Sequence, residues 1–357
     1  MRPDVLLVGD GSSIHLRRLA AGLAQQNLQV ELAGFEGDPV GELPFHRLGD
    51  LPARIDARYA LAIPRLASVI RRRRPRVVNA HYVTSFGVMS ALALWLAHPT
   101  GARPPLIQTA WGDDLLVTPQ RSRFMRRLVT FALRSAALMT GDAQELRNVA
   151  SGFAPRTPTA SFVFGPPESL LQRHEQKAHV IVSARHLLPE MRVDLVIRSF
   201  LHAQAASPAL ADWSLVVVGD GPERGFLEQL AAEGSNVEFR GAIDHGTLHD
   251  LLLRASVSVS VPVSDGTSAT LLESLAAAAV PVVNDLPANL EWVDGGTAVI
   301  VGRNPTVDEL SQGIVSAGEG DWDVRRLQAK VSAVTWESQV GGFADILRGL
   351  ALEAARS

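Results

Sequence analysis

The sequence predicts an α/β protein with two Rossmann-like domains, each built on a parallel, doubly wound sheet. Its 357 residues exceed one typical domain of ~150 residues. Short apolar runs rich in β-branched residues alternate with longer amphipathic stretches, which is the rhythm of repeated β-α units. This rhythm breaks between residues 151 and 178, where proline, glycine and polar residues accumulate. We therefore expect a linker there, with one domain on each side.

The first domain is predicted to cover residues 1–165. Its strands are expected where short apolar runs precede or follow amphipathic stretches. The expected strands are Val5–Val8, Val30–Ala33, Val77–Val78 and Leu106–Ile107, and the clearest helices are Leu16–Gln26 and Arg123–Leu133.

The second domain is predicted to cover residues 177–337. Its expected strands are His179–Ser183, Ser214–Val218, Val237–Arg240, Val257–Val261 and Val280–Val283. The last stretch, Val324–Ser357, predicts helix, with Trp336 as an apolar anchor. We expect its final part, 338–357, to pack back on the first domain.

Composition excludes several classes of protein. With 46% hydrophobic and 20% charged residues, the chain can bury a core and is not expected to be disordered. A net charge of -3 gives no basic footprint for a phosphate backbone, so nucleic acid is not an expected partner. Because there is no cysteine, disulfides, zinc thiolates and a thiolate nucleophile are all excluded.

Apolar segments are too short for a membrane protein. The apolar run at the start stops at Val8, before a turn, whereas a signal peptide needs a longer one. The run Val88–Ala97 covers about half of the ~20 residues that span a bilayer. We expect a soluble cytoplasmic enzyme, and the Ala- and Arg-rich composition suggests a bacterial gene. Arg71–Arg74 ends a helical pattern, where cations suit the helix C-terminus and solvent; a peripheral contact with an anionic membrane is the alternative.

Two glycine turns follow predicted strands. The first, from Gly9 to Ile14, resembles a dinucleotide fingerprint, but Ile14 stands at the third glycine position. Its Gly11 would still let backbone N–H groups approach a phosphate. The second turn runs from Gly219 to Glu223, and a plain strand-to-helix turn explains it as well as a ligand does.

The most informative segment is Ser264–Glu273. A small, polar loop follows a predicted strand, and the helical run Ala269–Ala279 begins immediately after it. Hydroxyl and N–H groups at a helix N-terminus suit a diphosphate. Glu273 lies about one turn into that helix, from where its carboxylate could accept two ribose hydroxyls. Asp265, in the loop, could contact a sugar. The donor-binding residues predicted here are Asp265, Gly266, Thr267, Ser268, Ala269, Thr270, Leu271 and Glu273.

Several segments along the chain occur in the order found in a known family. Asp265 and Glu273 are separated by seven residues. This spacing of two acids resembles the donor-site signature of the retaining glycosyltransferase family 4, of GT-B fold. The other matching segments are Ser13–His15, Asn79–His81, Trp111–Asp114, Ser183–Arg185, Pro189–Asp194, Val218–Pro222 and Val237–Gly241. The resemblance covers nearly the whole chain and is strongest between His179 and Val301.

The resemblance implies a nucleotide-sugar donor bound in a cleft between the domains, mainly by the second one. In that family the first acid contacts sugar hydroxyls and the second holds the ribose, which here are Asp265 and Glu273. An Arg and a Lys normally face the diphosphate. Arg185 matches the Arg, but Met191 stands at the Lys position, and we leave open whether Arg192 replaces it. Asp265 is also one methylene shorter than the usual Glu, which alters its reach toward the sugar.

The remaining site predictions concern the nucleotide and the acceptor. Gly219 and the backbone near Arg240 and Ile243 are expected to contact the nucleotide. Because backbone contacts do not reveal which base is preferred, uridine, guanosine, adenosine and thymidine all stay open. The acceptor is expected to meet the first domain at four polar side chains. These are His15, His81, Asp113 and Asp114, although His81 could be a half-buried structural histidine and Asp114 a helix cap.

The resemblance implies a hexosyl transfer with retention of configuration, in which the leaving phosphate helps to accept the acceptor's proton. The residues assigned to catalysis are Asp265, Arg185 and Asp114, and we expect no metal or cofactor. The acceptor could be a glycan, a lipid-linked molecule or a secondary metabolite, and the sequence does not determine the oligomeric state. Three alternatives remain: a non-catalytic nucleotide-sugar binder, an epimerase or phosphorylase on the same scaffold, and, more remotely, a nicotinamide-dependent oxidoreductase.

Overall fold

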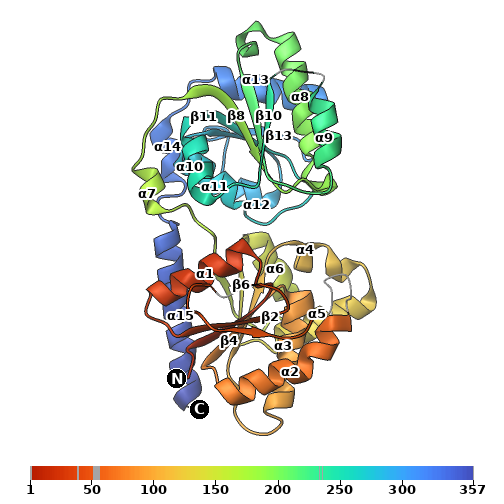
Figure 1. Cartoon of the computed structure of the whole chain (residues 1–357), viewed down its shortest axis with the longest axis vertical. Coiled ribbons are helices and arrows are strands. Elements are labelled where there is room, and N and C mark those ends of the chain that lie inside the picture. Colours follow the sequence, from red (N-terminus) through yellow and green to blue (C-terminus); the bar gives the residue numbers. More distant parts are fainter. Residues whose placement is uncertain (1, 38–39, 51–56, 233, 235, 357) are drawn as a thin grey trace. The chain divides into compact units, whose positions relative to one another are not determined.

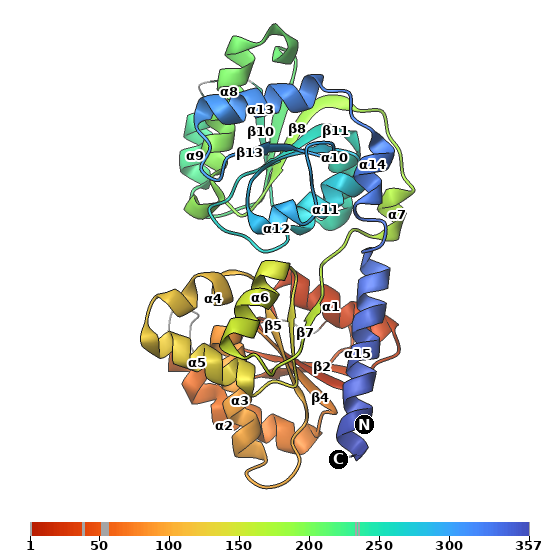
Figure 2. The same ribbon diagram turned by 180° about the vertical axis from the view of Figure 1, so that it is seen from behind.

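The chain forms two compact units, each with one parallel sheet flanked by helices (Figures 1 and 2). The computed structural model describes residues 2–37, 40–50, 57–232, 234 and 236–356. Unit 1 consists of Met1–Phe164 together with Glu337–Ser357, and unit 2 consists of Gly165–Trp336. The predicted α/β class with two parallel sheets is confirmed.

The sheet of unit 1 has the strand order β3-β2-β1-β4-β5-β6-β7, and all its neighbours are parallel. The strands are β1 (Val5–Val8), β2 (Val30–Gly34), β3 (Phe45–Arg47), β4 (Val77–His81), β5 (Leu106–Ala110), β6 (Leu138–Gly141) and β7 (Thr159–Ser161). The strand order changes direction between β1 and β4. The loops after these two strands therefore lie at the position where parallel sheets commonly bind ligands.

The strands β3, β6 and β7 were not predicted. The strands β3 and β7 form the two edges of the sheet and are three residues long and incompletely buried, so they carry no apolar run. The strand β7 also lies inside the segment that we interpreted as a linker. In β6, Leu138 and Met139 come only a few residues after a helix that ends at Arg134, so in the sequence they read as a continuation of its apolar pattern.

Helices cover both sides of this sheet and enclose its core (Figure 1). They are α1 (Ile14–Gln25), α2 (Ala57–Arg73), the π-helical turn η1 (Val83–Gly87), α3 (Val88–Ala97), α4 (Asp113–Leu116), the 3-10 turn η2 (Thr118–Gln120), α5 (Arg123–Arg134), α6 (Gln144–Phe153) and α15 (Trp336–Arg356). Fully buried Leu6, Leu66 and Met89 belong to this core. Among the described residues, no helix is long and apolar enough to cross a bilayer.

The sheet of unit 2 has the order β10-β9-β8-β11-β12-β13, again with parallel neighbours. The strands are β8 (Ala178–Ala184), β9 (Ser214–Val218), β10 (Val237–Gly241), β11 (Ala255–Ser260), β12 (Val280–Asn284) and β13 (Val299–Val301). All five strands expected here are present, and only the edge strand β13 was missed. The order reverses between β8 and β11, so the segments that follow these strands lie side by side.

The helices of unit 2 connect these strands. They are α7 (Glu168–Leu171), the 3-10 turn η3 (Pro189–Met191), α8 (Val193–Ala206), the 3-10 turn η4 (Pro208–Leu210), α9 (Arg224–Ala231), α10 (His245–Arg254), α11 (Ala269–Ala276), α12 (Pro287–Leu290), α13 (Val307–Glu319) and α14 (Val324–Ala329). The helix α11 begins at Ala269 as predicted but stops three residues early, because Ala278 adopts a left-handed φ of 57° just before β12.

The prediction of one helix over Val324–Ser357 is wrong. The chain leaves helical geometry between α14 and α15, where Val331 is fully buried and Trp336 N–H donates to the carbonyl of Pro166. A Cβ on Gly165 would lie 1.7 Å from the carbonyl oxygen of Val334, so the two segments cross in close contact. A continuous helix cannot make this crossing.

Candidate functional site: a guanidinium at the start of a buried helix

Three side chains predicted for the donor site contact one another in unit 2. Arg185 follows β8, and Asp265 and Ser268 lie in the loop between β11 and α11. Arg185 Nη2 donates to Asp265 Oδ2 at 2.5 Å, and its Nη1 donates to Ser268 Oγ at 3.1 Å. The side chains of Arg185 and Asp265 are 12% and 22% exposed, so their ion pair is largely shielded from water. This places a fixed guanidinium beside the N-terminus of α11, where the helix dipole also favours an anion.

Met191 takes part in this arrangement, although it cannot carry charge. Its sulfur lies 3.1 Å from Nη2 and 3.4 Å from Nε of Arg185. A lysine at this position would place a second cation against the guanidinium. Met191 packs beside Arg185 and itself brings no charge to the start of α11.

Glycines in the second turn allow Arg185 to approach this place. Gly219 has a φ of 125°, and a Cβ there would lie 2.0 Å from the carbonyl oxygen of Arg185. A Cβ on Gly221 would lie 2.4 Å from that of Leu187. These glycines are therefore explained by close packing of the backbone against residues 185–187. Their effect on the site is indirect, because they position Arg185.

The loop that carries Asp265 is fixed from two sides. Val263 N–H donates to the carbonyl of Glu190 at 2.9 Å, and Asn284 Nδ2 donates to that of Pro262 at 2.8 Å. Asn284 is fully buried at the end of β12. The indole N–H of Trp292 donates to Thr267 Oγ1 at 3.1 Å. The position of the loop thus depends on side chains that no sequence motif had indicated.

Glu273 is 1% exposed and lies against two histidines of α10. His249 Nε2 lies 3.1 Å from Glu273 Oε1, and His245 Nδ1 lies 3.6 Å from the same oxygen. Burial alone would raise the pKa of Glu273, but interactions with His245 and His249 outweigh it and lower the pKa to about 2. Glu273 is therefore an ionised acceptor. The ligand atoms of these three residues lie within 4.8 Å of one another, so they could also hold a metal ion.

The other predicted donor residues lie around this centre in different settings. Arg192 caps α8 with a φ of 54° and donates to Arg303 O and Asn304 Oδ1, so its guanidinium is engaged there. Arg240 forms an exposed ion pair with Glu238. Ile243 is half-buried in the loop between β10 and α10. The remaining loop and helix residues, Gly266, Ala269, Thr270 and Leu271, are buried or half-buried. Their contacts with a nucleotide stay predictions.

In unit 1, four rings gather where β4 and β5 end. The Trp111 ring lies 5.6 Å from His15, 5.6 Å from His81 and 5.2 Å from Phe164, measured between ring centroids, and His15 lies 4.9 Å from Phe164. We call these four residues the aromatic group. Aromatic faces with a few polar atoms are typical of ligand pockets. The sequence had indicated His15 and His81 as acceptor-side residues and Trp111 only as part of a family segment, whereas Phe164 had not been indicated.

His81 is held neutral by burial. It is 2% exposed, and burial lowers its pKa to about 3. Asn79 Nδ2 donates to Thr109 Oγ1, so Asn79 Oδ1 is left to accept from His81 Nε2–H at 3.0 Å. The unprotonated Nδ1 of His81 is buried and has no partner among the described residues. His81 can accept a hydrogen bond but is a weak base.

Asp114 holds the loop that carries Trp111. Its carboxylate accepts from the backbone N–H groups of Val83, Trp111 and Gly112 at 2.8 to 3.1 Å. Burial raises its pKa, and these hydrogen bonds act in the opposite direction. The structure therefore gives Asp114 a positioning contact, while neighbouring Asp113 is exposed.

Gly11 packs closely inside unit 1. A Cβ there would lie 2.4 Å from the carbonyl oxygen of Glu36 and 2.4 Å from the Phe45 ring. The packing explains the glycine without a ligand, and its role at a phosphate stays a prediction.

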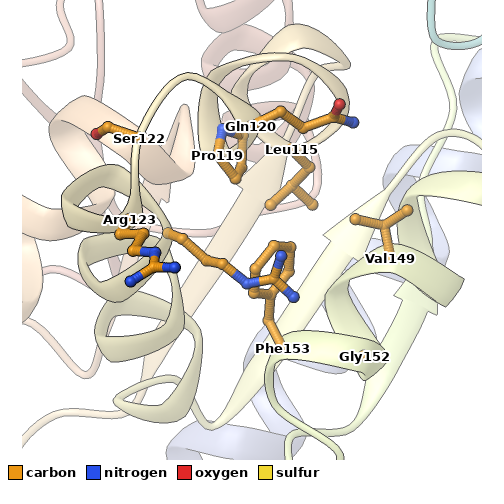
Figure 3. A pocket seen from close by; sticks show the side chains of 9 residues that line it. Leu115, Pro119, Gln120, Ser122, Arg123, Val149, Gly152 and Phe153 are labelled. Carbon is orange, nitrogen blue, oxygen red and sulfur yellow. The ribbon is translucent and has the colours of Figure 1, made fainter.

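A hollow of about 700 Å³ lies on unit 1 beside α4 (Figure 3). Gln120, Arg123 and Phe153 are among the residues that line it (Figure 3), and the Arg126 guanidinium lies 5.2 Å from the centre of the Phe153 ring. Leu115 lines this hollow and belongs to α4, as do Asp113 and Asp114. The hollow therefore lies beside the helix that carries two of the predicted acceptor-side residues. No sequence motif had indicated it.

Two family models and one curated relative match this chain. The model described as glycosyl transferase 4-like matches residues 4–142, and the model described as glycosyl transferases group 1 matches residues 177–319. An exopolysaccharide phosphotransferase of Streptomyces coelicolor is 27% identical over 264 residues, which are 70% of this chain. The chain spans about a quarter of the length of that relative, because the match covers 26% of it.

Solved structures share the fold at low sequence identity. Anabaena HepE in complex with UDP and glucose has a TM-score of 0.69 at 14% identity, covering 99% of this chain and 98% of that one. An α,α-trehalose 6-phosphate synthase of Burkholderia multivorans has a TM-score of 0.75 at 13% identity, covering 100% of both chains. The chain therefore belongs to the group 1, family 4-like glycosyltransferases and has the GT-B fold.

Proposed function

We propose that this glycosyltransferase moves a sugar from a nucleoside diphosphate sugar to a hydroxyl acceptor, with retention of configuration. The observation that carries the proposal is the Arg185 guanidinium, held by Asp265 and Ser268 at the N-terminus of α11. A guanidinium fork donates parallel hydrogen bonds to phosphate oxygens. Together with the helix end, it supplies the positive potential that a diphosphate leaving group needs.

Asp265 has two roles in this proposal. In the free protein it orients Arg185. When a diphosphate engages the guanidinium, the carboxylate is placed to accept hydrogen bonds from hydroxyls of the donor sugar. Because Asp265 reaches less far than a glutamate, the sugar has to bind closer to the loop.

Glu273 is assigned to the ribose. A carboxylate has about four acceptor sites, so it can accept two ribose hydroxyls in addition to its contact with His249. Glu273 is almost completely covered in the free protein, whereas His245 beside it is 33% exposed. We therefore expect ribose binding to uncover Glu273 by a movement of a neighbouring side chain, with His245 as the first candidate.

The reaction breaks the bond between the anomeric carbon and the diphosphate and forms a bond from the same carbon to the acceptor oxygen on the same face. The acceptor's proton passes to an oxygen of the leaving phosphate. His81 is a poor candidate for that proton because its pKa is about 3. We assign acceptor binding to His81 and the other members of the aromatic group, and the positioning of Trp111 to Asp114. Arg185 is assigned the stabilisation of the leaving group, without a metal.

The donor base is tested first with a thermal-shift series of nucleoside diphosphates. The structures of HepE contain UDP or UDP-glucose, which makes UDP the first candidate here. A ligand that binds only the folded protein at 100 times its Kd stabilises it by about 2.7 kcal/mol. We expect one nucleoside diphosphate to raise the melting temperature, and expect Glu273→Ala to weaken its binding. An unchanged Kd in Glu273→Ala would remove Glu273 from the ribose site.

Turnover distinguishes the remaining alternatives. Transfer to an acceptor, or slow hydrolysis of the donor, would exclude a non-catalytic binder. Conversion of the donor without an acceptor would point to an epimerase or phosphorylase. Stabilisation by NADH and by no nucleoside diphosphate would overturn the proposal. Proton NMR of the first-formed product gives the anomeric configuration, and an inverted product would contradict the proposed route.

A further inference from the structure

One face of unit 1 combines cations with exposed apolar side chains. The segment 115–141 contains five arginines and no acidic residue. These are Arg121, Arg123, Arg126, Arg127 and Arg134. None of them forms an ion pair or a side-chain hydrogen bond within the described ranges, and their side chains are exposed. Four of them belong to α5, and at 100° per residue they lie within about 100° of its circumference.

The neighbouring helix α3 exposes an apolar stripe. Leu92, Trp95 and Leu96, spaced as i, i+3 and i+4, are 37%, 53% and 46% exposed. Surface helices normally direct such a stripe toward the core. Phe124 on α5 is 67% exposed as well.

A second hollow joins the two features. It measures about 640 Å³ and is lined by Trp95 of α3 together with Arg123, Arg126, Arg127 and Arg134 of α5. It shares Arg123 and Arg126 with the hollow of Figure 3. We call the exposed side chains of α3 and α5 the α3–α5 face.

We propose that the α3–α5 face docks on the surface of an anionic lipid bilayer. Arginines near an anionic membrane are attracted to its phosphates, and exposed aromatic and leucine side chains enter the interfacial region. A tryptophan suits that region because its ring is apolar and its N–H is polar. A soluble polyanion would account for the arginines but would leave the apolar stripe without a partner.

The arginine run identified in the sequence does not have this combination. Arg2 and Arg71–Arg74 line a hollow of about 730 Å³, but no apolar residue lines it. Arg73 is already paired with Glu31. This patch therefore offers charge alone and provides a control of matched charge.

The experiment measures binding of the full-length protein to vesicles by co-sedimentation, without any substrate. Phosphatidylcholine vesicles are compared with vesicles that also contain phosphatidylglycerol. Arg126→Gln with Arg127→Gln removes two charges from the α3–α5 face, and Arg71→Gln with Arg72→Gln removes two from the other patch. We expect binding only to the anionic vesicles, weakened roughly 30-fold by the first pair and little by the second.

A second pair of variants tests the apolar part. Phe124→Ser is compared with Leu61→Ser, since these side chains are 67% and 68% exposed, on α5 and α2. We expect Phe124→Ser to weaken vesicle binding about fivefold to tenfold and Leu61→Ser to leave it unchanged. Melting temperatures of all variants verify that they fold.

Three results would overturn the proposal: no binding to anionic vesicles, equal loss in both arginine pairs, or binding to soluble polyphosphate that vesicles do not compete away. Because no nucleotide or acceptor is present, a failure here is distinct from a failure of the proposed transfer reaction.

Discussion

At the scale of single residues, the proposed donor site contains one short ion pair. Arg185 and Asp265 are 80 positions apart, yet their charged atoms lie 2.5 Å from each other. A pair so largely buried costs desolvation, which its two partners offset only while both are present. The pair therefore fixes the guanidinium, and Met191, which packs beside it, adds no second cation.

Asp265→Asn is predicted to lower turnover by about 100-fold or more, because the carboxylate that contacts the donor sugar is lost. The Kd of the nucleoside diphosphate should change much less than turnover, because the amide oxygen of the introduced asparagine can still accept a hydrogen bond from Arg185 and the N-terminus of α11 is unaltered. Steady-state kinetics and calorimetric titration measure the two effects. Asp308→Asn, an exposed change on α13, is the control, and unchanged turnover in Asp265→Asn would remove Asp265 from the site.

The lowered pKa of Glu273 leads us to expect that the free energy of unfolding depends on pH. Its pKa in the folded protein, about 2, lies below the ordinary value of 4.5. A lowered pKa stabilises the fold above the ordinary value, and this contribution is lost as the pH falls from about 4.5 toward 2. The contribution is about 3 kcal/mol. Urea unfolding at about pH 6 and about pH 3 should show the gap between wild type and Glu273→Gln narrowing, and a constant gap would contradict this.

At the scale of elements, the second glycine turn has a structural role that controls the site. Gly219 adopts a left-handed φ of 125° while the backbone of residue 185 passes against it. The sequence left two explanations for this turn, and the packing favours the structural one. The turn nevertheless affects function, because it determines where Arg185 lies.

Gly219→Ala is predicted to destabilise unit 2 by about 1–3 kcal/mol through backbone strain. It should also weaken nucleoside diphosphate binding about tenfold, because the displaced Arg185 loses a charge-assisted hydrogen bond. Gly225→Ala is the matched control, since a Cβ there meets open space in α9. If both variants bound the nucleotide equally well, the proposed link between the turn and Arg185 would be wrong.

At the scale of the whole molecule, the last helix belongs to the first unit. The ring of Phe343 in α15 lies 4.9 Å from that of Phe162, and Arg348 Nη2 donates to the carbonyl of Gln26 at 2.7 Å. Gln339 Oε1 accepts from Val163 N–H at 3.1 Å. Unit 1 is therefore completed by residues that follow unit 2 in the chain, and it cannot be completed until they are present.

Phe343→Ala is predicted to destabilise unit 1 by about 3–5 kcal/mol, because it leaves a cavity beside Phe162. Calorimetry should show one unfolding transition shifted, with the Kd of the nucleoside diphosphate unchanged. Leu352→Ala, which alters a side chain 57% exposed on the same helix, should shift neither. A loss of nucleotide affinity in Phe343→Ala would show that the units do not unfold separately.

The amino-acid sequence by itself determined the fold class, most of the buried strands and the start of α11 after a small polar loop. Buried parallel strands carry uninterrupted apolar runs, and a helix that begins after a small polar loop has a recognisable start. The edge strands β3 and β7 escaped detection because they are only partly covered by neighbouring elements and contain polar residues. The edge strand β13 is apolar, but its three residues are too few to stand out as a run.

Only the tertiary structure decided which side chains meet. It paired Arg185 with Asp265, placed His245 and His249 against Glu273, and brought His15 and His81 into ring contact with Trp111. Such contacts depend on strand order, which puts β8 beside β11 although more than 70 residues separate their starts. Local propensity and periodicity act over a few residues, whereas the order of strands follows from the packing of the complete sheet. Which side chains contact one another in the site is therefore decided only when the chain is folded.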